Sequence, residues 1–212
     1  DFAFRGAAYD LSQFDDFEEV SQWVHPGALG AFEFNDGYYA MPDQMSFPVL
    51  FYRADILSEL QIPVPQTWED IITIIPFLQT NNMEFFMEVS PPPTLGAATQ
   101  STTKAINSVY LSMLYQQGGE LYNGAGTRAM TDSPESLVAF EKWTDYYTKN
   151  SFPVTVDFVT RFRLGSVPLA IVNFTNYTTL SVSAPEIRGD WGIAPIPGTR
   201  QENGTIDRSL PA

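Results

Sequence analysis

The sequence contains no cysteine among its 212 residues and only one histidine, His25. Without cysteine the chain has no disulfide, no thiolate metal site and no cysteine nucleophile. A catalytic triad would have to be built around His25. Without thiolates, the side chains that could bind a metal are mainly carboxylates. We therefore expect His25 to be structural or exposed, and we expect neither a metal nor a cofactor.

Basic residues are also scarce: 11 Lys and Arg stand against 25 Asp and Glu, which gives a formal net charge of −14. Nucleic acids and anionic membrane surfaces bind proteins through clustered Lys and Arg, so this excess of acidic residues argues against both as partners. No apolar run approaches the roughly 20 residues of a membrane-spanning helix. Phosphate-binding glycine motifs are missing too, because the glycines between 118 and 126 follow a predicted helix instead of opening one.

The chain does have enough apolar material for a packed core, with 44% hydrophobic and only 17% charged residues. Short apolar runs predict strands at 37–41, 49–52, 84–89, 168–172 and 191–196. Periodic runs with capping residues predict helices at 11–24, 55–60, 67–78, 104–117, 133–149, 157–163 and 174–183. Alternation of helices and strands predicts an α/β fold.

The best-defined helix starts lie at Thr67 and Ser133. Either hydroxyl can cap a helix, and Pro134 suits the first helical position. Pro76 lies inside the pattern that begins at Thr67, so we expect it to kink or shorten that helix. The Pro-, Gly- and Thr-rich run at 90–101 is too long for a simple connector, and we interpret it as a functional loop.

Catalytic chemistry finds little support in the sequence. The acid pairs at 15–16 and 18–19 are typical of a solvated helix face. A glycosidase needs two carboxylates on facing elements, which adjacency in sequence does not provide. Aromatic residues, at 14% of the chain, are the remaining signal. Most of them belong to a core, but Tyr and Trp also suit sugar recognition, because a flat ring stacks on the C–H face of a pyranose.

Three stretches carry a family resemblance: "YAMPDQMSFPVLFYRADILSELQIPVPQTWEDI", "FRLGSVPLAIVNFTNYTTL" and "GDWGIAPIPGT". They resemble, in the same order, the signatures of the extracellular solute-binding proteins of bacterial ABC importers, the family 1 type that mostly binds sugars. The closing run "APEIRGDWGIAPIPGTRQENGTIDRS" is similar to large solute-binding lipoproteins of spore-forming Gram-positive bacteria.

The resemblance implies an α/β architecture of two lobes, of the type II periplasmic-binding-protein kind, in which a lobe is a mixed sheet flanked by helices. It implies that 1–47 is a remnant of the N-terminal lobe, 48–195 the C-terminal lobe and 196–212 a segment returning to the N-terminal lobe. The strand at 46–52 would then be a crossover, and hinge closure on a ligand would be the family's mechanism.

The resemblance also implies a solute site in the cleft between the lobes. Its candidate ligand-binding residues are Asp43, Gln44, Ser46, Tyr110, Asn173, Phe174, Asn176 and Tyr177. Many relatives carry Gly-Pro-Trp where this chain has 174–177, so Tyr177 or Phe174 would take the stacking role. The crossover is bulkier and more apolar than usual, which leaves a peptide-like or modified-sugar ligand open.

The hypothesis that follows is a non-enzymatic binding protein that delivers a solute, expected to be a mono- or oligosaccharide, to ABC permease subunits. The protein would be extracellular and attached to the cell surface by a lipid anchor outside these residues. Two alternatives stay open: a ligand-sensing protein that serves a receptor, and a glycosidase that uses two of the many carboxylates.

Overall fold

The computed structural model describes residues 2–42, 47–88 and 108–210. The chain divides into two compact units, Asp1–Ser46 with Ala212 and Phe47–Pro211. The run at 90–101, which we interpret as a functional loop, lies outside the described residues.

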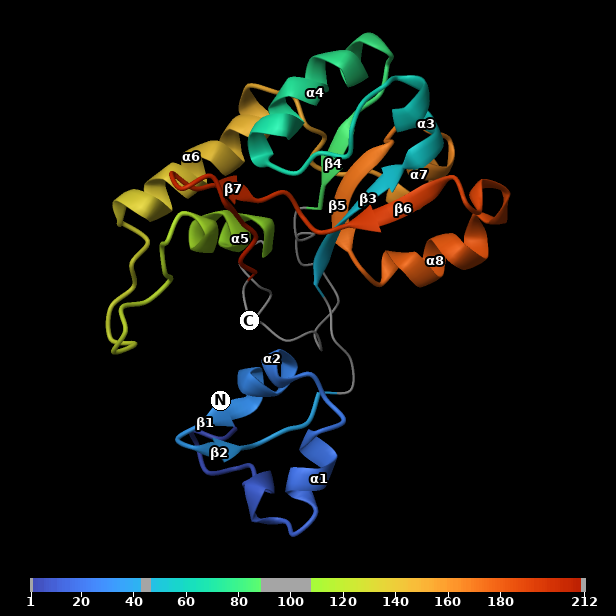
Figure 1. Cartoon of the computed structure of the whole chain (residues 1–212). Helices are drawn as coiled ribbons and strands as arrows, with labels where there is room; N and C mark the ends of the chain where they lie inside the picture. Colours follow the sequence, from blue (N-terminus) through green and yellow to red (C-terminus); the bar gives the residue numbers. More distant parts are fainter. Residues whose placement is uncertain (1, 43–46, 89–107, 211–212) are drawn as a thin grey trace. The chain divides into compact units, whose positions relative to one another are not determined.

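The larger unit is built on one four-stranded sheet with the strand order β4-β5-β3-β6 (Figure 1). The strands are β3 (Pro48–Arg53), β4 (Phe85–Met87), β5 (Leu169–Asn173) and β6 (Trp191–Ala194). β3 pairs antiparallel with β5 and β6, while β4 runs parallel to β5. All four strands were predicted from the sequence, and the mixed sheet confirms the predicted α/β fold.

The two central strands are buried on both faces, which explains their unbroken apolar sequence. Because successive side chains of a strand point to opposite faces, neighbours in β3 and β5 enter different cores. Leu50 and Ile171 belong to one cluster of buried residues, and Phe51 and Ala170 belong to the other. All four side chains are fully buried.

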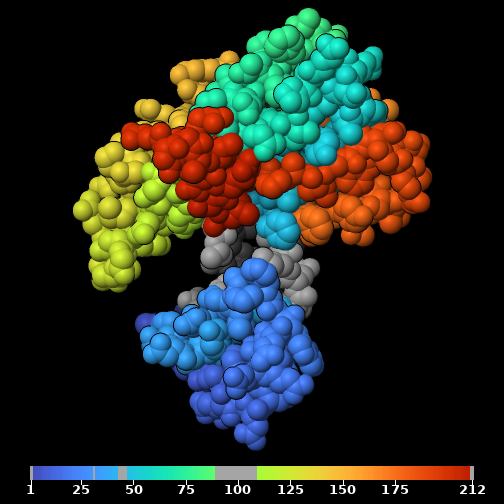
Figure 2. All heavy atoms as spheres, viewed as in Figure 1, coloured from blue at the N-terminus to red at the C-terminus, as the bar shows by residue number. Residues whose placement is uncertain are grey.

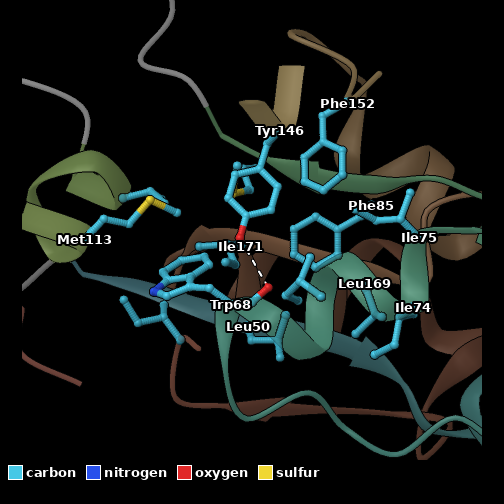
Figure 3. Close-up of a cluster of buried hydrophobic side chains, with 14 of the residues drawn as sticks. Leu50, Trp68, Ile74, Ile75, Phe85, Met113, Tyr146, Phe152, Leu169 and Ile171 are labelled. Atoms are coloured by element: carbon cyan, nitrogen blue, oxygen red, sulfur yellow. Dashed lines mark hydrogen bonds between the residues drawn. The ribbon is translucent and has the colours of Figure 1, made fainter. Parts of the chain in front are cut away.

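Helices cover both faces of this sheet (Figure 1). They are α3 (Ala54–Glu59), α4 (Trp68–Thr80), α5 (Ser108–Gln116), α6 (Pro134–Thr148), α7 (Phe158–Arg163) and α8 (Asn176–Ser183). Residues of α4, α5 and α6 join the cluster that contains Leu50, and residues of α7 and α8 join the cluster that contains Phe51. Figure 3 shows the first cluster, in which the Tyr146 hydroxyl donates a hydrogen bond to the Trp68 carbonyl oxygen at 3.2 Å.

The predicted caps are present at both helix starts. The Thr67 hydroxyl accepts a hydrogen bond from the Asp70 amide while the Asp70 carboxylate accepts one from the Thr67 amide, which is a capping box. The Ser133 hydroxyl caps α6 by accepting from the Ser136 amide. Pro76 does not shorten α4, which continues to Thr80, so that part of the prediction is wrong.

Residues 196–210 pack within the larger unit. Gln116, with 1% of its surface exposed, lies at the centre of this packing. Its side-chain oxygen accepts hydrogen bonds from the Trp68 indole at 2.8 Å and the Thr199 hydroxyl at 3.1 Å, and its side-chain nitrogen lies 3.4 Å from the carbonyl oxygen of Pro197. Figure 2 shows the C-terminal segment, in red, lying over α4 and α5. The expected lobe boundaries of a longer protein stay a prediction, but in this chain 196–210 does not stand apart from 48–195.

The smaller unit departs from the predicted helix at 11–24. It contains a 3-10 turn, Leu11–Gln13, and a short helix α1, Phe17–Ser21, separated by extended backbone at Phe14. The apolar residues of this segment recur strictly every third position, and each step of three falls about 60° short of a full turn of an α-helix. Five such positions cannot share one face, and Trp23 is accordingly 75% exposed.

The rest of the smaller unit is short elements. They are α2 (Pro26–Leu29), a 3-10 turn (Gly30–Phe32), β1 (Glu33–Phe34) and β2 (Gly37–Tyr38). Asn35 and Asp36 both have positive φ, as a tight hairpin turn between β1 and β2 requires. His25 caps α2 by accepting a hydrogen bond from the Gly27 amide at its Nδ1, which is a structural role.

Candidate ligand-binding site

The junction between β5 and α8 brings four predicted site residues together. β5 ends at Asn173 and α8 begins at Asn176. The Asn173 side-chain oxygen accepts a hydrogen bond from the Thr175 amide at 3.0 Å, and the Asn176 side-chain nitrogen donates to the Asn173 carbonyl oxygen at 3.1 Å. These bonds close the turn, so both amide side chains are held in place.

Four aromatic rings follow one another at this junction, and we call them the aromatic row: Phe47, Phe174, Tyr177 and Trp191. Phe47 and Phe174 are stacked with ring centroids 5.3 Å apart, and Phe174 and Tyr177 are stacked at 5.8 Å. Tyr177 meets Trp191 edge to face at 5.6 Å. The order of rings therefore runs from the start of β3 across α8 to β6.

The register of the sheet explains how the row forms. Pro48 of β3 pairs with Asn173 of β5, so the residues just outside this pair, Phe47 and Phe174, lie side by side. Their backbones are joined by a hydrogen bond from the Phe174 amide to the Phe47 carbonyl oxygen at 2.9 Å. At the other end, Trp191 packs on the buried Phe51 and Phe162, which anchors the row in the core.

The middle of the row is open to solvent. Phe174 is 38% exposed and Tyr177 is 46% exposed, whereas Phe51 and Phe162, on which Trp191 packs, are buried. A half-exposed ring offers a flat apolar surface, and the neighbouring amide and phenol groups offer hydrogen bonds. That combination can hold the C–H face of a sugar ring while bonding its hydroxyl groups.

Of the other four predicted site residues, the structure describes one, Tyr110, which lies in α5 and not at this junction. Asp43, Gln44 and Ser46 lie outside the described residues. Tyr110 lies in α5, where its hydroxyl is 2.9 Å from the Ser136 hydroxyl and its ring packs against Phe140 and Trp143. The position of Tyr110 indicates a packing role between α5 and α6.

Two residues of the aromatic row, Phe47 and Trp191, were not predicted as site residues. An antiparallel pairing of the strands at 49–52 and 168–172 would have placed Phe47 beside Phe174. No sequence signal places Trp191 next to Tyr177, because that contact depends on β6 being the neighbour of β3. In the part of the chain that the structure describes, no group of three or more His, Asp or Glu could hold a metal ion, and no helix is long and apolar enough to cross a membrane.

Solved structures with the same arrangement of elements are solute-binding proteins. A solute-binding protein of an ABC transporter from Thermotoga lettingae, bound with α-D-tagatose, has a TM-score of 0.71 and 19% identity over 99% of this chain and 52% of its own. The maltose-bound MalE3 of T. maritima has a TM-score of 0.71 and 22% identity over 92% of this chain and 49% of its own. A third, from Agrobacterium radiobacter K84 in complex with ribitol, has a TM-score of 0.69 and 17% identity over 99% and 52%.

These likenesses define the fold as that of a type II periplasmic-binding protein, which confirms the expected class. The chain spans about half the length of these relatives. No match was found among curated proteins. The family model of the bacterial extracellular solute-binding proteins matches residues 2–206. The chain therefore belongs to the bacterial extracellular solute-binding protein family, as its three signature stretches indicate.

Proposed function

We propose that this chain carries the solute-binding surface of the extracellular component of an ABC importer, and that its solute is a mono- or oligosaccharide. The observation that carries the proposal is the aromatic row, with two half-exposed rings beside two oriented amide side chains at the β5–α8 junction. Family membership supports binding and transport as the setting. Three solved relatives support a sugar or polyol, since their structures contain tagatose, maltose and ribitol.

In this proposal Tyr177 and Phe174 form the stacking platform. The two rings are stacked and nearly parallel, with centroids 5.8 Å apart and an interplanar angle of 10°, so each ring fixes the orientation of the other. Asn176 precedes Tyr177 at the start of α8. Its side-chain oxygen has no hydrogen-bond partner among the described residues and can accept from a sugar hydroxyl.

The proposed partners are the solute and ABC permease subunits. The proposed location is the extracellular face of the membrane, with attachment to the cell surface by a lipid anchor outside these residues. Nucleic acid is not a proposed partner, because the chain carries a formal charge of −14.

The test is a titration of the 15N-labelled chain with a panel of neutral mono- and disaccharides, followed by NMR. A one-sided platform encloses less of a ligand than a closed cleft does, so we expect a Kd of about 1 mM, or roughly −4 kcal/mol. Tyr177→Ala should weaken binding by about 1 kcal/mol, which is roughly fivefold in Kd. Tyr122→Ala is the matched control, since Tyr122 is also a half-exposed tyrosine but lies in the loop between α5 and α6.

Two results would contradict the proposal. One is a Kd that Tyr177→Ala and Tyr122→Ala change equally, because the aromatic row would then take no part. The other is cleavage of chromogenic glycosides by the purified chain at a rate that depends on its carboxylates, which would favour the glycosidase alternative.

A further inference from the structure

The surface of the larger unit is hollowed between α8 and β6, next to the aromatic row. The hollow has a volume of about 510 Å³, within the range of small-molecule sites. Its lining includes Tyr177, Leu180, Ser181, Ala184, Arg188 and Trp191. Figure 1 shows the two elements that bound it, α8 and β6, side by side in orange. The hollow therefore begins at Tyr177, where the proposed stacking platform ends.

Part of the lining of the hollow is held in place by the core. Leu180 and Ala184, on one side of α8, are 0% and 1% exposed and belong to the core cluster that contains Phe51. The Trp191 ring is held edge to face against Tyr177 and packs on Phe51. A ligand in the hollow would therefore meet the Tyr177 and Trp191 rings, whose orientation is fixed by this packing.

The polar groups of the hollow differ in what they can still bind. The Ser181 hydroxyl donates to the Tyr177 carbonyl oxygen at 2.7 Å, so its hydrogen is already used. Arg188 is exposed and makes no ion pair or side-chain hydrogen bond with any residue that the structure describes. All five of its N–H donors are available to a ligand.

Arg188 is the arginine that lines this hollow, in a chain where carboxylates outnumber basic groups by 25 to 11. The nearest acidic residues in sequence do not neutralise it. Glu186 is paired with Arg163, with the carboxylate oxygen 3.2 Å from the guanidinium nitrogen. Asp190 forms no ion pair among the described residues. The guanidinium therefore remains as a single positive charge at the mouth of an aromatic hollow.

We propose that this hollow selects a sugar that carries an anionic substituent, with Arg188 binding the charged group while the Tyr177 and Trp191 rings hold the sugar. This inference rests on the proposed function, since it shares Tyr177 with the stacking platform. It adds the class of solute, because a neutral sugar would leave the guanidinium unused. A planar guanidinium matches the two oxygens of a carboxylate or phosphate, so either substituent satisfies the geometry.

The experiment is an NMR titration of the 15N-labelled chain that follows the indole N–H of Trp191. The chain has four tryptophans, and Trp191→Phe identifies this signal. The probes are a neutral hexose, the corresponding hexuronate, the hexose 6-phosphate and inorganic phosphate alone. Because an exposed ion pair contributes little, we expect the hexuronate or the hexose phosphate to bind about fivefold more tightly than the hexose.

The variants are Arg188→Gln and the matched control Arg200→Gln, which removes the same charge from an exposed arginine of the same unit. Arg188→Gln should abolish the preference for the charged sugar and leave the hexose unchanged, while Arg200→Gln should keep the preference. Equal binding of charged and neutral sugars, or a preference that survives Arg188→Gln, would overturn the inference and leave the proposed function standing. A shift by inorganic phosphate as large as that by the hexose phosphate would show a simple anion site and overturn it as well. If no sugar of any kind binds, the proposed function itself fails.

Discussion

Replacing the buried Gln116 by leucine should destabilise the larger unit by removing the acceptor and donor that join α4, α5 and the segment 196–210. Leucine has a similar size, so the change leaves little cavity and mainly removes hydrogen bonds. The Trp68 indole, 2% exposed, would lose its partner at 2.8 Å, and the Thr199 hydroxyl would lose one at 3.1 Å.

The expected cost follows from these two bonds. A buried donor left without a partner costs about 1–3 kcal/mol. The indole N–H has no other hydrogen-bond partner among the described residues and loses the most, whereas the Thr199 oxygen still accepts from the Gln117 side chain at 3.2 Å. The carbonyl oxygens of Pro197 and Ser209, at 3.4 Å, add little. We therefore expect Gln116→Leu to lower the free energy of unfolding by about 2–4 kcal/mol.

The assay is urea unfolding of the 212-residue chain, followed by circular dichroism. With a typical slope of 1–3 kcal/mol per molar urea, the midpoint should fall by about 1–2 M. Gln79→Leu is the matched control, because Gln79 is an exposed glutamine of α4 whose side chain makes one hydrogen bond, to the Asn150 carbonyl oxygen. We expect that control to change stability by less than about 0.5 kcal/mol.

A double-mutant cycle with Trp68→Phe isolates the bond itself. Once Gln116 is leucine, removal of the indole N–H should cost less than it does in the original chain, because no partner remains to be lost. A cost below about 1 kcal/mol for Gln116→Leu, or strictly additive effects in the cycle, would refute the argument that this buried network stabilises the unit.

Two further predictions concern single positions. The Arg53 side chain donates to Asp55 and holds the pKa of that carboxyl below its ordinary value of 3.8. The Arg53–Asp55 ion pair therefore stabilises the folded chain above pH 3.8, and this stabilisation is lost as the pH falls through the lower pKa of the folded state. Urea midpoints measured from pH 7 to pH 3 should show the loss. Asp55→Asn should flatten that part of the profile. Gly165→Ala should destabilise by more than about 1 kcal/mol, because Gly165 has a φ of +81° and an added Cβ would lie 2.8 Å from Ile56 Cδ1. Gly124→Ala is its control, since nothing lies within 4 Å of that Cβ, and equal melting temperatures for the two variants would contradict the prediction.

Local signals in the sequence were sufficient to predict most helices and strands of the larger unit. Thr67 and Ser133 cap helices because a side-chain oxygen needs only an amide two or three residues away. Gly118, at φ +76°, ends α5 because glycine tolerates that backbone without strain. The runs that became β3 and β5 could be identified because strands buried on both faces are continuously apolar.

Local signals gave wrong predictions at two places, the segment 11–24 and Pro76. The spacing of three at 11–24 resembles a helical face, but it drifts around the helix axis and leaves no common buried side. Pro76 is an unfavourable residue in a helix interior, yet Ile74, Ile75 and Leu78 around it are buried in the core. Burial of these side chains offsets the lost backbone hydrogen bond, and α4 continues.

The sequence by itself determined the family, the α/β class and the group at the β5–α8 junction, because those depend on residues close together in the chain. Only the tertiary structure decided which rings complete the aromatic row and which charge faces the hollow beside it. Trp191 contacts Tyr177, and Arg188 lines the same hollow, because β6 pairs with β3 and α8 lies beside it. The packing of α5 on α6 likewise decided that the Tyr110 hydroxyl lies 2.9 Å from the Ser136 hydroxyl. Contacts of this kind depend on the order of strands in the sheet and on helix packing, neither of which any local pattern of residues specifies.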